Sequence, residues 1–178
     1  DQNISSIFSM DKNGSIYTVL MDEPIIDIAS EARLYKNEMN IEYFNGLITN
    51  SEIKNQNNTV SNFSLNGSID FKNFFEPRYS LSATGKDIFF RSLNQDIESF
   101  IDIDVGIFGK DTVDITGTIT ARNGAIFKEF KSSEITAVSN RSERVTTNYN
   151  IRFPIEDTFS IRNSQIDAKI TGEMAMSR

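Results

Sequence analysis

Acidic side chains gather in one short stretch, where Asp102, Asp104 and Asp114 share the polar parity of an alternating sequence. The segment DIDVG (102–106) faintly resembles a calcium loop, but such a loop needs more oxygen ligands at closer spacing. Carboxylates that alternate with Ile and Val are typical of the water-facing side of a strand. We therefore interpret them as a solvated face, and we expect no metal site and no cofactor.

Other catalytic chemistries lack their essential residue types. The chain has no His and no Cys, although Ser and Thr are abundant. A Ser-His-Asp triad, a thiol nucleophile and a disulfide framework are therefore excluded. No pair of carboxylates stands in a recognisable glycosidase context. The sequence predicts that the protein is not an enzyme.

Size and charge narrow the classes of partner. A chain of 178 residues with a net charge of −7 makes one domain or two small repeats, and it lacks the clustered Lys and Arg that nucleic acids require. The charge also argues against electrostatic docking to anionic lipid headgroups. No apolar run reaches the roughly 18–20 residues of a transmembrane helix. Because the chain opens on Asp1, we expect a processed or excised segment whose targeting element lies outside it.

The elements that position the acidic side chains show mainly one pattern. Apolar and polar residues alternate along them with a period of two. This pattern predicts two long hairpins, each with one apolar and one polar face. The first runs through Ile101–Ile107, a turn at Gly109–Asp111 and Val113–Ala121, and the second through Ile151–Ile161, a turn at Asn163–Ser164 and Ile166–Met176.

The remaining segments are less regular. The stretch 25–39 fits a helix through Ile28, Ala32 and Tyr35, but we favour two strands broken at 36–38 because period two also fits. Residues 55–58 read as a loop. The polar stretch 128–150 predicts a linker between sub-repeats at about 1–127 and 151–178, and residues 135–138 could add one strand there.

Glycines repeat in one local pattern: a polar residue, Gly, a variable residue, then Ile or Met. Gly67, Gly117 and Gly172 share the parity of their apolar neighbours and are separated by 50 and 55 residues. Glycine weakens a strand interior, so these positions indicate a bend, a bulge or a close approach. At Gly124, and also at Gly14, the Asn-Gly pair instead suggests a hairpin turn.

Three segments resemble the TamB family of AsmA-like envelope proteins, the translocation and assembly module proteins. They are LNGSIDFKNFFEPRYSLSATGKDIFF (65–90), DIDVGIFGKDTVDITGTITARNGAIF (102–127) and IRFPIEDTFSIRNSQIDAKITGEMAM (151–176), in family order. The resemblance covers about residues 40–178 and lies in pattern rather than in invariant chemistry. It implies an all-β fold called a β-taco, an elongated, curved, mostly antiparallel sheet with an apolar inner groove.

The resemblance also implies a periplasmic segment of a bacterial envelope protein, anchored in the inner membrane elsewhere in its chain. The implied functions are phospholipid transport between the inner and outer membranes and assistance in outer-membrane protein assembly. The implied partners are phospholipid acyl chains, an Omp85-type outer-membrane protein (TamA-like) and outer-membrane protein clients.

The residues alone leave two architectures open. A sheet with one apolar face and no amphipathic helix to cover it either closes on a second sheet or shelters apolar material. Acyl chains suit such a face because the hydrophobic effect is non-directional. The alternative is a closed β-sandwich, a binding or adhesion module in which the same residues form an ordinary core. Edge strands that pair with client strands are a third possibility.

The expected groove lining is the apolar parity of the strands, with three glycines among it. The lining residues are Phe63, Leu65, Ile69, Ile101, Ile103, Val105, Ile107, Val113, Ile115, Ile119, Phe153, Ile155, Phe159, Ile161, Ile166, Ile170 and Met174, and the groove glycines are Gly67, Gly117 and Gly172. A through-channel requires Ile103, Val105, Ile115 and Ile170 to line one open path.

Overall fold

The computed structural model describes residues 5–19, 21–48, 62–129 and 146–177, and these residues form an all-β protein. The predicted fold class is therefore confirmed. The strands are β1 (Ser5–Ile16), β2 (Ile25–Tyr35), β3 (Glu38–Leu47), β4 (Phe63–Asp70), β5 (Arg78–Arg91), β6 (Ile97–Gly109), β7 (Thr112–Ile126), β8 (Thr146–Arg162) and β9 (Asp167–Ser177).

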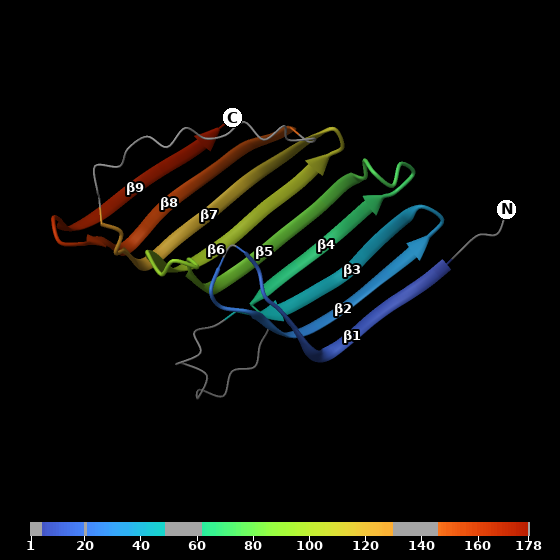
Figure 1. Ribbon diagram of the computed structural model, residues 1–178, viewed down its shortest axis with the longest axis horizontal. Helices are drawn as coiled ribbons and strands as arrows, with labels where there is room; N and C mark the ends of the chain where they lie inside the picture. Colours follow the sequence, from blue (N-terminus) through green and yellow to red (C-terminus); the bar gives the residue numbers. More distant parts are fainter. Residues whose placement is uncertain (1–4, 20, 49–61, 130–145, 178) are drawn as a thin grey trace.

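All nine strands belong to one sheet, and their order in space is their order in the sequence. They lie side by side in a single layer, with β1 and β9 at its two edges (Figure 1). Every neighbouring pair is antiparallel except β7 and β8, which are parallel. Within the described ranges no second sheet faces this one, so the alternative of a closed sandwich is wrong for this part of the chain.

The register keeps the apolar residues of successive strands on the same face. Directly paired residues point to the same side of a sheet. One row across the strands pairs Phe63 with Gly85, Gly85 with Ile103, and Ile103 with Ile119. The next row pairs Val105 with Gly117 and Gly117 with Ile151. The predicted apolar parity therefore forms one apolar face that runs from strand to strand.

Both predicted hairpins are confirmed. In β6–β7, Ile107 lies opposite Ile115, and in β8–β9, Ile161 lies opposite Ala168. The stretch 25–39 forms β2 and the start of β3, with Tyr35 opposite Glu38 across the turn, so the strand interpretation is also confirmed.

Two local expectations are wrong. Gly14 and Gly124 lie inside β1 and β7, where the register shifts, so their Asn-Gly pairs sit at bulges rather than at hairpin turns. β8 begins at Thr146, whereas the sequence analysis assigned 146–150 to a linker. The expected loop at 55–58 and the possible strand at 135–138 lie outside the described residues.

A packed core occupies one end of the apolar face. Ile25, Ile28, Ile48 and Ile88 are buried there, and Phe44, Phe63, Ile101 and Ile103 pack against them among other partly buried side chains. The β1–β2 connection, of which the structure describes residues 17–19 and 21–24, crosses the sheet toward β5 at this end (Figure 1). We call these residues the strap.

The strap is held to the last residue of β5. The backbone N–H of Asp22 donates to the carbonyl oxygen of Arg91 at 2.8 Å. The buried Glu23 carboxylate lies 3.5 Å from the Arg91 guanidinium, and Met21 packs on the core. The face is therefore filled over part of its length and open over the rest.

Candidate functional site

An apolar cavity of about 560 Å³ lies on the open part of the apolar face, over β5–β9. Its volume falls within the roughly 300–1,000 Å³ that is typical of small-molecule sites. The residues that line it are Phe90, Ile97, Ser99, Ile101, Ile119, Ala121, Ile126, Phe153, Ile155, Phe159, Ile161, Ile170, Thr171, Gly172, Glu173 and Met174.

The lining of the cavity offers few polar groups that could hydrogen-bond to a ligand. The Ser99 hydroxyl lies 3.0 Å from the carbonyl oxygens of both Phe100 and Arg122, and its single O–H can donate to either of them. Glu173 is the charged member of the lining, and it is exposed. The site therefore offers mainly apolar surface to a ligand.

The structure brings about half of the predicted groove residues into this cavity. These residues are Ile101, Ile119, Phe153, Ile155, Phe159, Ile161, Ile170 and Met174, together with Gly172. They come from the C-terminal hairpin and from β6 and β7, and the register places them on one face.

The other predicted residues lie outside the cavity. Ile103 and Phe63 pack against the core beneath the strap. Val105 and Val113 are buried on the sheet, whereas Ile166 is exposed in the β8–β9 turn, one residue before β9 begins. The remaining predicted members, Leu65, Ile69, Ile107, Ile115, Gly67 and Gly117, share the apolar face without lining the cavity.

The four residues required for a through-channel therefore do not line one cavity. Of Ile103, Val105, Ile115 and Ile170, the cavity takes in Ile170 alone. The strap and its core fill the apolar face near β2–β5, so the cavity is confined to the β5–β9 side.

Sequence reasoning missed Phe90, which stands next to Phe89 where the period-two alternation breaks. The register of β5 against β6 shifts between Gly85 and Ile88. This shift turns Phe90 toward the cavity, whereas Phe89 packs edge-to-face against Phe100 with ring centroids 5.5 Å apart. The broken alternation was the signal for this bulge, but it could not show which ring faces the groove.

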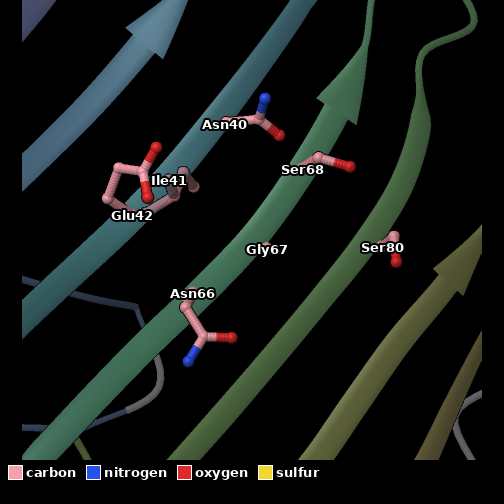
Figure 2. A pocket seen from close by; sticks show the side chains of 7 residues that line it. All are labelled: Asn40, Ile41, Glu42, Asn66, Gly67, Ser68 and Ser80. Carbon is pink, nitrogen blue, oxygen red and sulfur yellow. The ribbon is translucent and has the colours of Figure 1, made fainter.

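A polar hollow of about 420 Å³ lies over β3, β4 and β5 beside Gly67. Figure 2 shows Asn40, Ser68 and Ser80 on neighbouring strands, with no side chain at Gly67. Glu42 supplies the ionisable group of this hollow.

The acidic residues of the polar face act in hydrogen bonds between strands. Asp102 and Asp87 each accept from Arg122 Nη2 at 2.6 Å, and Asp102 also accepts from the backbone N–H of Asp87 at 2.8 Å. Asp114 accepts from the Asn148 side chain at 2.9 Å. In the part of the chain that the structure describes, no group of three or more His, Cys, Asp or Glu is placed to hold a metal ion.

These features define a class: an all-β protein built on one open sheet, with an apolar cavity on one face. No family model, no curated protein and no solved structure matches this chain. No helix among the described residues is long and apolar enough to cross a membrane.

Proposed function

We propose that the cavity over β5–β9 binds the acyl chain of a phospholipid and shelters it from water. The observation that carries this proposal is the cavity itself, whose lining is contributed mainly by Ile, Phe and Met side chains of five strands. No second layer of the described chain covers it. An apolar face left open in water favours an apolar guest.

The energetics suit an acyl chain. Each buried methylene contributes about 0.8 kcal/mol, so about eight covered methylenes would gain roughly 6 kcal/mol before ordering costs. This stabilisation needs no specific polar contact, which agrees with a lining that offers few polar groups. Transport of phospholipid between the inner and outer membranes, in the periplasm, is the physiological role that we propose for such a site.

Met174 allows a test that does not depend on the core, because its side chain lines the cavity and is 58% exposed. Met174→Glu should place a charge in the cavity without unfolding the sheet. Met10→Glu is the matched control: Met10 is also an exposed methionine on an edge strand, and it lies outside the cavity.

A fluorescent fatty acid titrated from solution gives the affinity of each variant. Met174→Glu should weaken binding at least about tenfold, and Met10→Glu should leave it within about twofold of the parent. Mass spectrometry of the purified parent should detect bound phospholipid. Parental affinity in a folded Met174→Glu protein would rule out this cavity as the lipid site.

The sheet edges support a second candidate function, assistance in the assembly of outer-membrane proteins. β1 and β9 have 12 and 11 residues and each has one paired neighbour, so each leaves a row of backbone groups for a further strand. A photo-cross-linker at Ala175 on β9 should capture a nascent β-barrel client. The control position is Ser68, in the polar hollow on the inner strand β4. If the cross-linker captured a client at Ser68 and none at Ala175, pairing at the β9 edge would be excluded.

A further inference from the structure

The β4–β5 connection, residues 71–77, presents two strongly exposed aromatic side chains next to each other. Phe74 is 75% exposed and Phe75 is 90% exposed. Their rings contact each other edge-to-face, with centroids 5.6 Å apart. The centroids of the Phe74 and Phe71 rings are 6.4 Å apart. We call residues 71–77 the aromatic tip.

The aromatic tip is an ordered turn. The N–H of Glu76 donates to the carbonyl oxygen of Asn73 at 3.1 Å, and the Asn73 side chain donates to the Glu76 carboxylate at 2.7 Å. These bonds close a turn whose two central residues are Phe74 and Phe75. At its base, the N–H of Lys72 donates to the Asp70 carboxylate at 2.9 Å, which lowers the pKa of Asp70.

Neighbouring turns surround the aromatic tip with charged side chains. It lies at the same end of the sheet as the β2–β3 and β6–β7 turns (Figure 1). Lys72 pairs with Asp70 at 3.4 Å, and Lys110 lies 3.3 Å from Glu76 and 3.8 Å from Asp111. With Arg78, the cations Lys72 and Lys110 balance the three carboxylates, so the charge around the tip is close to zero.

We propose that the aromatic tip docks this protein on a bilayer of zwitterionic phospholipid, with Phe74 and Phe75 inserted among the acyl chains. Mixed charges at the base match a headgroup that carries both a phosphate and an ammonium. Exposed aromatic rings beside Lys and Arg side chains suit the membrane–water interface. This inference is independent of the acyl-chain cavity, which lies toward the other end of β5, at Phe90.

A bilayer fits the tip better than a protein surface does. Two Phe side chains can bury at most about 300–500 Å², whereas a stable protein interface needs about 800 Å² from each partner. A pair of protruding rings can enter a fluid bilayer without a complementary pocket. The balanced charge also implies binding that gains little from anionic lipid, consistent with the net charge of −7.

The experiment uses the absence of Trp from the sequence. Phe75→Trp introduces a single Trp at the tip, and Val19→Trp is the matched control, since Val19 is 85% exposed and lies on the strap at the opposite end of the sheet. With phosphatidylcholine vesicles, the emission of Phe75→Trp should shift to the blue and be quenched by brominated acyl chains. The emission of Val19→Trp should not change.

Flotation with the same vesicles measures the energetic contribution of the tip. The double variant Phe74→Ser/Phe75→Ser should fold normally because both side chains are exposed, and it should lose at least about tenfold in vesicle partitioning. Added phosphatidylglycerol should change the partitioning of the parent less than about threefold. The double variant should still bind a fatty acid from solution, and Met174→Glu should still bind vesicles.

Three results would overturn the proposal. The first is parental flotation of the double variant, and the second is a blue shift of Val19→Trp without one of Phe75→Trp. The third combines two observations: the parent binds no vesicles, and light scattering shows that it forms a dimer that the double variant does not form. The tip would then join two copies of this chain.

Discussion

At the residue scale, Gly67 and Gly117 occupy positions where the sheet has no room for a side chain. Their φ angles are +129° and +145°, a region that residues other than glycine rarely adopt. A Cβ at Gly117 would collide with the carbonyl oxygen of Asp104 and lie 2.8 Å from the Cα of Val105. The pairing of β7 with β6 continues through Gly117 without a shift, so the glycine marks close backbone approach and not a bulge.

Gly117→Ala and Gly172→Ala form a matched pair that separates backbone strain from collision. Gly172 has a similar φ of +142°, but a Cβ there meets nothing within 4 Å. Gly172→Ala should cost about 1 kcal/mol of unfolding free energy, and Gly117→Ala roughly 2 kcal/mol more. Urea unfolding measures both values. Equal losses would mean that the neighbouring strand moves aside and that the collision adds nothing.

At the element scale, the strap determines how much of the apolar face is open. It runs from β1 to β2, yet it is fixed to β5 by the Asp22–Arg91 hydrogen bond and by the Glu23–Arg91 ion pair. Arg91 also lies over the Phe89 ring, 5.1 Å from its centroid. Arg91 therefore connects a loop to strands that are distant from it in the sequence.

Arg91→Met should release the strap because it leaves the Glu23 carboxylate buried without its partner. The expected loss of stability is about 1–3 kcal/mol, since Arg91 itself is partly exposed. Arg33→Met, which removes the exposed pair with Glu31, is the control and should leave the free energy of unfolding nearly unchanged. Hydrogen exchange at the Asp22 amide should quicken in Arg91→Met alone. An unchanged exchange rate would show that the core holds the strap without the ion pair.

At the scale of the whole molecule, one sheet carries two separate surfaces for which we propose a role. The apolar cavity lies over the strands from β5 to β9, and the aromatic tip lies at the end of the sheet where β4 meets β5. The proposed acyl ligand and the proposed bilayer would bring lipid to both places. The cavity has a finite volume because the strap and its core fill the face near β2–β5.

The finite cavity predicts how affinity depends on acyl chain length. Each added methylene should tighten the binding of a fatty acid about three- to fourfold until the cavity is full, and further methylenes should add little. Calorimetric titration with a series of saturated fatty acids measures this dependence. Affinity that rises without a plateau through the longest chains would instead indicate a groove that continues beneath the strap.

The sequence by itself determined the all-β class, the two hairpins and the face on which the regularly alternating apolar side chains lie. Period-two alternation is a local property, and it assigned Ile119, Phe153 and Ile170 to one face before any pairing was known. It also indicated a bend, a bulge or a close approach at Gly117, because this glycine interrupts an apolar face.

Only the tertiary structure decided which part of that face is open. Ile103 and Ile119 are opposite each other in the register, yet one packs on the core and the other lines the cavity. The parallel pairing of β7 with β8, the bulge before Ile88 and the anchoring of the strap at Arg91 depend on contacts between distant residues. Alternation records which side of a strand is apolar, and it carries no information about what lies above that side.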